Sequence, residues 1–138
     1  MPCVVDASVV LAVLLPDETQ PAEAFVADLI GGGARAPAHC ATEVCNGLVV
    51  AYRRGRITRD EMGSALSDVA ALRIASDARD RFGVSADVVN LALAHRLTVY
   101  DAAYLELARR SGLPLATFDG ALRAAAVSEG VPLLETTS

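Results

Sequence analysis

The sequence has no lysine, only two histidines and three cysteines, and no long apolar run in its 138 residues. Cys3, Cys40 and Cys45 form no CxxC pair, and an odd number of cysteines argues against a disulfide scaffold or a structural zinc site. They are expected to be small buried thiols. No apolar stretch is long enough to cross a bilayer, and no charged segment precedes the first apolar run. We therefore expect a cytoplasmic protein with no membrane partner.

The charge balance gives no general attraction to nucleic acid, because the formal net charge is −5. Apart from the two histidines, every basic residue is arginine, whose planar fork of donors suits phosphate recognition. Genomic base composition explains an arginine-only, alanine-rich chain equally well. The charge pattern alone therefore assigns no partner.

Length and a hydrophobic content of 53% indicate one domain over residues 1–138, with 135–138 as a loose tail. Short apolar strands alternate with helical stretches, which is typical of an α/β domain with a short parallel sheet flanked by helices on both faces. The expected strands are Cys3–Asp6, Ala34–Ala36, Leu72–Ala75, Leu115–Phe118 and Val131–Leu134. The expected helices are Ala7–Leu15, Pro21–Ile30, Ala38–Arg54, Thr58–Ala71, Ser85–His95, Thr98–Ser111 and Gly120–Ser128.

Four acidic residues stand out: Asp6, Glu43, Asp101 and Asp119. Asp6 and Asp119 end apolar strands, and ligands of open α/β sheets bind outside the carboxyl ends of strands. Glu43 and Asp101 lie near the start of helices. A carboxylate among apolar neighbours is costly unless it is paired or neutralised, and no basic residue is adjacent in sequence. The residues would be explained together if they shared a divalent metal, and an all-oxygen set suits Mg²⁺ or Mn²⁺.

Each acid also has a simpler interpretation. Asp6 and Asp119 are in positions to cap the helices that follow them. Asp101 is favourable in a first helical turn, and Glu43 could be solvated. Composition and spacing leave the metal site and these separate roles about equally supported.

Polar neighbours could support a shared site. Thr117 is two residues from Asp119 on the same strand face, so its hydroxyl can hydrogen-bond a carboxylate. Ser8 has the same spacing from Asp6, although it lies past the strand. Asn46 is one helical step from Glu43 and could orient it or touch substrate. His39 could also support Glu43, or could be a surface or packing residue at the helix start.

At these residues the chain resembles the PIN-domain ribonucleases, and among them the VapC toxins of bacterial toxin–antitoxin systems. The matching segments are Val4–Ser8, Thr42–Asn46, Tyr100–Ala108 and Gly112–Asp119. They span the chain in order, and the last two in tandem are the most specific. The segment Arg53–Arg81 carries no matching motif.

The resemblance implies that Asp6, Glu43, Asp101 and Asp119 are the metal-binding acids, and that Ser8, Asn46 and Thr117 accompany them. It implies a Mg²⁺- or Mn²⁺-dependent endoribonuclease that is a homodimer and is silenced by a VapB-type antitoxin. Asp6, Asp101 and Asp119 would hold metal, while Glu43 would bind metal directly, bind it through water, or help to deprotonate the nucleophile.

Four arginines after the Glu43 helix are candidates for RNA contact, with a solvated face or antitoxin contacts as the equal alternative. They are Arg53, Arg54, Arg56 and Arg59. Two other functions stay open at this point. One is a non-catalytic interaction module with the same fold, and the other is a metal-dependent phosphatase or DNA nuclease using the same acids.

Overall fold

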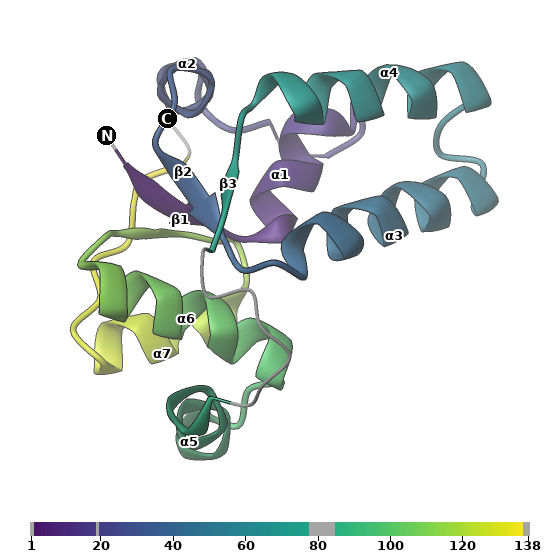
Figure 1. Cartoon of the computed structure of the whole chain (residues 1–138). Helices are drawn as coiled ribbons and strands as arrows, with labels where there is room; N and C mark the ends of the chain where they lie inside the picture. Colours follow the sequence, from purple (N-terminus) through teal and green to yellow (C-terminus); the bar gives the residue numbers. More distant parts are fainter. Residues whose placement is uncertain (1, 19, 78–84, 137–138) are drawn as a thin grey trace.

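The computed structural model describes residues 2–18, 20–77 and 85–136. Short parallel strands alternate with helices along the chain (Figure 1). The strands are β1 (Cys3–Val5), β2 (Ala34–Ala36), β3 (Ala75–Ser76) and β4 (Leu115–Ala116). The helices are α1 (Ala7–Leu14), α2 (Glu23–Ile30), α3 (Cys40–Arg53), α4 (Arg59–Ala71), α5 (Ala86–His95), α6 (Val99–Ser111) and α7 (Gly120–Ser128).

The strands form one sheet in the order β3-β2-β1-β4, and every pairing within it is parallel. Strand β2 pairs with one edge of β1, whereas β4 pairs with its other edge. The strand order therefore reverses between β1 and β4. Crevices outside the carboxyl ends of strands at such a reversal are where open α/β sheets bind ligands. Asp6 directly follows β1, so it lies at this point.

Helices cover both faces of the sheet, which confirms the expected α/β architecture. Helices α5, α6 and α7 lie on one side, and α1, α3 and α4 lie on the other (Figure 1). The central strand β1 is fully buried, with Val4 and Val5 at 0% exposure. Tyr104 and Leu105 of α6 are also fully buried in the same core. A strand covered on both faces needs apolar residues at every position, which explains the unbroken apolar run Cys3–Val5.

Helices α3 and α4 project from the sheet as an antiparallel pair (Figure 1). A second, smaller apolar cluster joins this pair to α1; it contains Leu15, Leu48, Ala51, Ile57 and Ala65. The turn between the helices is held by Arg56, whose guanidinium donates to both carboxylate oxygens of Asp17, at 2.7 and 2.9 Å, and to Glu18 at 2.9 Å. Thr58 and Glu61 form a capping box at the start of α4, where the sequence predicts a helix start.

Close packing of α3 against α1 depends on a glycine. A Cβ built at Gly47 would lie 2.5 Å from Cδ1 of Leu11. Gly63, within α4, faces open space instead. Alanine at a helical glycine normally stabilises by about 0.5–1 kcal/mol, but overpacking costs about 1–3 kcal/mol.

We therefore expect Gly63→Ala to raise the free energy of unfolding by roughly 0.5–1 kcal/mol and Gly47→Ala to lower it. Urea denaturation of both variants measures the difference, with Gly63→Ala as the matched control for helix propensity. Equal stabilisation by the two substitutions would contradict the close approach of Gly47 to Leu11.

Two strands and one cysteine differ from the sequence predictions. Cys3 and Cys40 are buried as expected, but Cys45 is exposed. The third strand lies at Ala75–Ser76 instead of Leu72–Ala75, because Leu72 still caps α4 and Arg73 turns the chain in a left-handed conformation (φ 53°). The last predicted strand, Val131–Leu134, is reduced to a single bridge between Leu115 and Leu133, next to a proline that has no N–H to donate.

Thr136, which the sequence predicts to lie in a loose tail, is held against the N-cap residue of α2. The carbonyl of Thr136 accepts a hydrogen bond from Ala22 at 2.8 Å, and Thr136 is only 4% exposed. Residues 137 and 138 lie outside the described part. None of the helices that the structure describes is both long enough and apolar enough to span a bilayer.

Candidate active site

Asp6 occupies the junction between β1 and α1. It is 4% exposed, and its Oδ2 accepts hydrogen bonds from the hydroxyls of Ser8 at 2.9 Å and Thr117 at 2.6 Å. Asp6 has the backbone position of an N-cap, yet its side chain makes no capping hydrogen bond to α1. The carboxylate is instead fixed by two neutral hydroxyls, which hold it in place and leave its charge intact.

Asp119 has the equivalent place after β4. It also stands at an N-cap position, that of α7, without a side-chain capping bond. Its backbone N–H donates to Thr117 Oγ1 at 3.0 Å, and the N–H of Phe118 donates to Ser8 Oγ at 3.3 Å. These bonds join the ends of β1 and β4. Helix capping therefore does not explain either Asp6 or Asp119, which removes the simpler interpretation of both.

Glu43 and Asp101 come from the first turns of α3 and α6. Glu43 Oε1 accepts a hydrogen bond from the Tyr104 hydroxyl at 2.7 Å and lies 3.1 Å from Nε2 of His39. The N–H of Asp101 donates to the hydroxyl of Thr98, the N-cap of α6, at 3.1 Å. The cap is thus Thr98, and Asp101 is not needed for it.

The charges of the other three acids act on Asp101. The pKa of Asp101 is raised, first by partial burial and then by the charges of Asp6, Asp119 and Glu43. Like charges act this way only when they are near each other. Asp101 therefore lies within electrostatic reach of the other three acids. We call Asp6, Glu43, Asp101 and Asp119 the four-acid cluster.

In residues 2–18, 20–77 and 85–136, no arginine forms an ion pair with this cluster. The arginine ion pairs there are made to other acids, as for Arg56 with Asp17 and Arg109 with Glu129. Two basic side chains of these residues lie beside the cluster: His39, whose Nε2 is 3.1 Å from Glu43 Oε1, and Arg123, whose Nη1 donates to the carbonyl of Thr117 at 3.0 Å. The described part of the chain contains no group of three or more His, Cys, Asp or Glu side chains placed closely enough to hold a metal ion as they stand.

A model of the PIN domain family matches residues 3–128 of this chain. The chain belongs to the PIN-domain family. It is 36% identical over 132 residues to Ribonuclease VapC3 of Pyrobaculum aerophilum, an alignment that covers 86% of this chain and 90% of that protein. Both findings confirm the resemblance inferred from the sequence motifs.

Solved structures give the same fold for this PIN domain. PAE2754 from Pyrobaculum aerophilum superposes with a TM-score of 0.68 at 25% identity, over 91% of this chain and 79% of that one. VapC20 of Mycobacterium tuberculosis, described as a toxin that cleaves the sarcin-ricin loop, matches with a TM-score of 0.57 at 17% identity over 99% of both chains. FitAcB of Neisseria gonorrhoeae matches with 0.58 at 17% over 96% of both.

The residues predicted to support the four acids differ in whether they contact an acid. Ser8 and Thr117 contact Asp6 as described above, so the predicted hydrogen bond from Thr117 to a carboxylate exists, although it crosses to the neighbouring strand. Asn46 is exposed on α3, and the described residues include no hydrogen bond from it to Glu43. An orienting role for Asn46 is therefore not seen, whereas substrate contact stays a prediction.

Three of the four arginines predicted to contact RNA are free of the ion pairs that engage the fourth, Arg56. Arg53, Arg54 and Arg59 are exposed at the far end of the α3–α4 pair, where the guanidinium of Arg59 lies 5.9 Å from the ring centre of Tyr52. Arg56 is engaged by Asp17 and Glu18, so its fork of donors is already used inside the protein. Arg56 is therefore a structural clamp, which its sequence position could not reveal.

Tyr104 is the site residue that sequence reasoning missed. It is fully buried, and its hydroxyl reaches Glu43 across 61 residues of sequence. Its position three residues after Asp101 offered a signal, because residues at that spacing share a face of a helix. A buried tyrosine also needs a partner for its hydroxyl. The tyrosine in Tyr100–Ala108 matched the family motif, but nothing in the sequence indicated its partner.

Burial of Cys40 and Tyr104 makes the fold sensitive to alkali. Burial raises the pKa of the Cys40 thiol from 9.0 to about 11, opposed by the Tyr104 hydroxyl and reinforced by Asp6 and Glu43. Burial also raises the pKa of Tyr104. Above pH 9 the unfolded chain releases protons that the folded chain keeps, so stability is complete below pH 9 and falls as pH rises.

We expect the free energy of unfolding to fall by on the order of 2–3 kcal/mol between pH 8 and pH 11. Urea denaturation in reducing, metal-free buffer measures it, and Cys40→Ala is expected to reduce the slope. An unfolding free energy that is flat over this range would show that the buried groups titrate normally.

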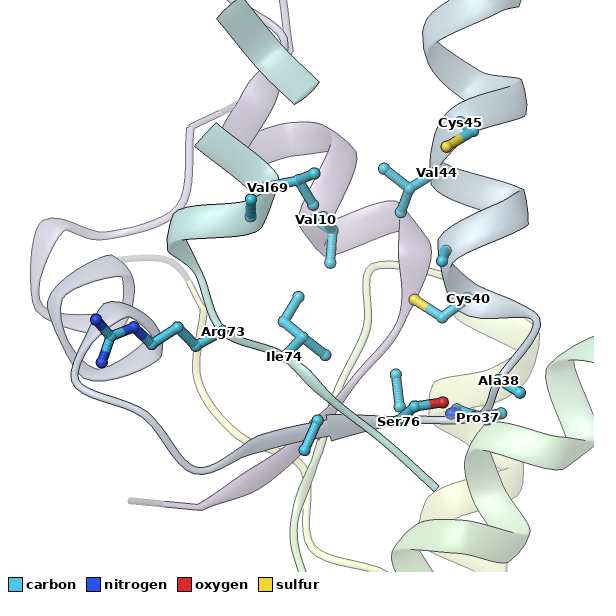
Figure 2. A pocket seen from close by; sticks show the side chains of 14 residues that line it. Val10, Pro37, Ala38, Cys40, Val44, Cys45, Val69, Arg73, Ile74 and Ser76 are labelled. Atoms are coloured by element: carbon cyan, nitrogen blue, oxygen red, sulfur yellow. The ribbon is translucent and has the colours of Figure 1, made fainter. Parts of the chain in front are cut away.

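A separate apolar pocket of about 260 Å³ lies between α1, α3, α4 and the β2–β3 edge of the sheet (Figure 2). Val10, Val44, Val69 and Ile74 point into it, whereas the guanidinium of Arg73 points away (Figure 2). Cys40 lines this pocket and also contacts Tyr104. The pocket therefore adjoins the cluster from the opposite side of α3.

Proposed function

We propose that the protein is the toxin of a type II toxin–antitoxin system and acts as a metal-dependent endoribonuclease. The observation that carries this proposal is the four-acid cluster, in which Asp101 feels the charges of the other three acids and no described arginine forms an ion pair with any of them. Membership of the PIN-domain family and 36% identity to Ribonuclease VapC3 support ribonuclease activity.

The cluster suits a hard divalent cation in ligand type and in charge. Asp6, Asp101 and Asp119 would hold Mg²⁺ or Mn²⁺, and Glu43 would bind it directly or through water. When bound, such an ion supplies activation of water and neutralisation of charge on the phosphodiester. Ser8 and Thr117 keep Asp6 oriented without cancelling its charge, because their hydroxyls are neutral donors.

The deciding experiment is cleavage of total RNA by the purified protein in Mg²⁺ or Mn²⁺, with cleavage sites mapped by sequencing. Matched panels of single-stranded DNA and a phosphomonoester test the other phosphate substrates that the same acids could serve. Preferential cleavage of DNA would replace the proposal with a DNA nuclease. A wild-type protein that binds RNA but cuts no substrate in any divalent metal would favour a non-catalytic module.

Exposed arginines on the α3–α4 pair are proposed to guide RNA. Arg53, Arg54 and Arg59 are exposed there. Glu43 and Arg53 are ten residues apart on α3, which places them about 15 Å apart along the helix. These arginines would therefore contact backbone phosphates away from the scissile bond and would contribute affinity without sequence readout. Arg56 is left out because Asp17 and Glu18 already occupy it.

A VapB-type antitoxin is the proposed partner. The apolar pocket of Figure 2 would accept apolar side chains of an antitoxin peptide. An arginine of that peptide would be attracted to the four-acid cluster, because carboxylates there lack a described arginine partner. Co-expression with the cognate antitoxin is expected to abolish RNA cleavage and to protect Cys45, an exposed lining residue of the pocket, from alkylation.

A homodimer is also proposed. Large apolar side chains are exposed on α5, α6 and α7, with Leu93 at 76%, Val99 at 52% and Val127 at 69%. Burial of such side chains against a second copy would remove them from water. We expect light scattering at micromolar concentration to give twice the mass of 14.3 kDa. A monomer mass would contradict this.

A further inference from the structure

We propose that Tyr104, together with His39, is a positioning residue that fixes the Glu43 carboxylate for catalysis. This inference rests on the proposed nuclease function. It identifies the residues that hold Glu43, the acid whose role is least defined. The Tyr104 hydroxyl donates to Glu43 Oε1 at 2.7 Å, and His39 Nε2 lies 3.1 Å from the same oxygen. Both contacts meet Oε1, and no described residue donates a hydrogen bond to Oε2.

Tyr104 ties two acid-bearing helices together. Glu43 is on α3, while Tyr104 is on α6, three residues after Asp101. One turn of α6 therefore carries both Asp101 and the donor that holds Glu43. Because Tyr104 is fully buried, packing fixes its ring and hence the position of its hydroxyl. The spacing of Glu43 and Asp101 is thereby set by a rigid element, whereas the Glu43 side chain itself is 34% exposed.

A phenol is well suited to this duty. Arginine or lysine at this position would pair with Glu43 and cancel the negative charge that a divalent cation requires. A neutral hydroxyl orients the carboxylate and leaves its charge in place, as Ser8 and Thr117 do for Asp6. A hydrogen bond from a buried donor to a charged acceptor is among the stronger kinds. A phenol has an ordinary pKa of about 10, so the hydroxyl keeps its proton at neutral pH.

His39 completes the support from the start of α3. Its Nε2 lies 3.1 Å from the carbonyl oxygen of Tyr100 and 3.1 Å from Glu43 Oε1. Both partners are acceptors, so Nε2 carries the hydrogen. The ring is held edge-on between Tyr100 and Tyr104, with centroid distances of 5.6 and 5.2 Å. His39 is therefore oriented by the same helix that supplies Asp101 and Tyr104.

The first test is Tyr104→Phe, which removes only the hydroxyl. We expect kcat for RNA cleavage to fall about 10- to 100-fold, the usual effect of losing a group that orients a ligand, with KM for RNA nearly unchanged. Mn²⁺ affinity, measured by calorimetry without RNA, should fall by about tenfold. Tyr52→Phe is the matched control, because it removes an exposed hydroxyl at the far end of α3. A purely structural role would lower the thermal midpoint and leave kcat and Mn²⁺ affinity unchanged.

The second test uses His39 and stays informative if Tyr104→Phe does not fold. His39→Gln retains a side-chain donor and should keep kcat within threefold or so of wild type, whereas His39→Ala should lose about tenfold. Equal activity of the two variants and of wild type would overturn the role of His39. Unchanged kcat and Mn²⁺ affinity in folded Tyr104→Phe would overturn the role of Tyr104.

Failure of the inference can be distinguished from failure of the proposed function. A wild-type protein that cleaves no RNA refutes the nuclease, yet the Mn²⁺ titrations of wild type, Tyr104→Phe and Tyr52→Phe still measure the positioning effect. Conversely, a wild-type protein that cleaves RNA alongside an equally active Tyr104→Phe variant refutes only the positioning role.

Discussion

Replacing Asp101 or Asp6 by asparagine is expected to reduce RNA cleavage by about a thousandfold or more. Each substitution keeps the shape of the side chain and removes one negative charge from the cluster. A bound divalent ion contributes several kcal/mol to stabilisation of the transition state, and each 1.36 kcal/mol is a factor of ten in rate. Single-turnover cleavage of a mapped RNA site by wild type, Asp6→Asn and Asp101→Asn measures the loss.

The matched control is Asp68→Asn. Asp68 is an exposed acid on α4, outside the four-acid cluster, so the same chemical change should leave the rate unchanged. Circular dichroism verifies that every variant is folded. Wild-type rates in both Asp6→Asn and Asp101→Asn would refute the assignment of the cluster as the active site.

The second large effect is that a divalent ion reverses which of two proteins, wild type or Asp101→Asn, has the higher melting temperature. Without a divalent ion, we expect Asp101→Asn to melt above wild type, by roughly 2–4 °C, because the substitution removes the cost of burying the Asp101 charge and also relieves repulsion from Asp6, Asp119 and Glu43. With the ion at about 100 times its dissociation constant, wild type gains about 2.7 kcal/mol, or roughly 8 °C. Asp101→Asn should gain much less, so the order of the two proteins reverses.

The dependence on pH follows from the same partial burial and repulsion. The pKa of Asp101 is raised in the folded chain, so the folded state holds a proton that the unfolded state has released. Its contribution to stability is therefore complete below the ordinary value of 3.8 and is lost as pH rises through the folded pKa. In metal-free buffer the advantage of Asp101→Asn over wild type should grow from pH 4 to pH 7. Differential scanning calorimetry in chelator and in Mn²⁺ measures both effects, and midpoints unmoved by Mn²⁺ would contradict metal binding.

Local sequence signals predicted most of the fold because they report local physics. The apolar run Cys3–Val5 and the capping box at Thr58 each place an element without reference to the rest of the chain. The third strand was misplaced because Arg73, a non-glycine residue, adopts a left-handed conformation that no sequence pattern signals. The last strand was predicted because its residues suit a strand. It is reduced to a single bridge because Pro132 lacks a backbone N–H that a longer ladder would need.

The places of the candidate acids in the fold could be predicted from the sequence, but the contacts that hold them could not. Asp6 and Asp119 end apolar runs, which is a local signal for the carboxyl edge of a sheet. The bond from Tyr104 to Glu43 and the clamp of Arg56 on Asp17 join residues 61 and 39 positions apart. Such contacts depend on how helices cross, and a single sequence holds no direct record of that geometry.

The bond between Thr117 and Asp6 spans 111 residues, which has a consequence for synthesis. Asp6 is made 111 residues before Thr117. A partly synthesised chain that ends before β4 therefore has only some of the carboxylates and lacks the hydroxyl of Thr117 that holds Asp6. Such a nascent chain is expected to be inactive. RNA cleavage would begin only after β4 and Asp119 have been made, which would give an antitoxin made alongside the toxin time to be present first.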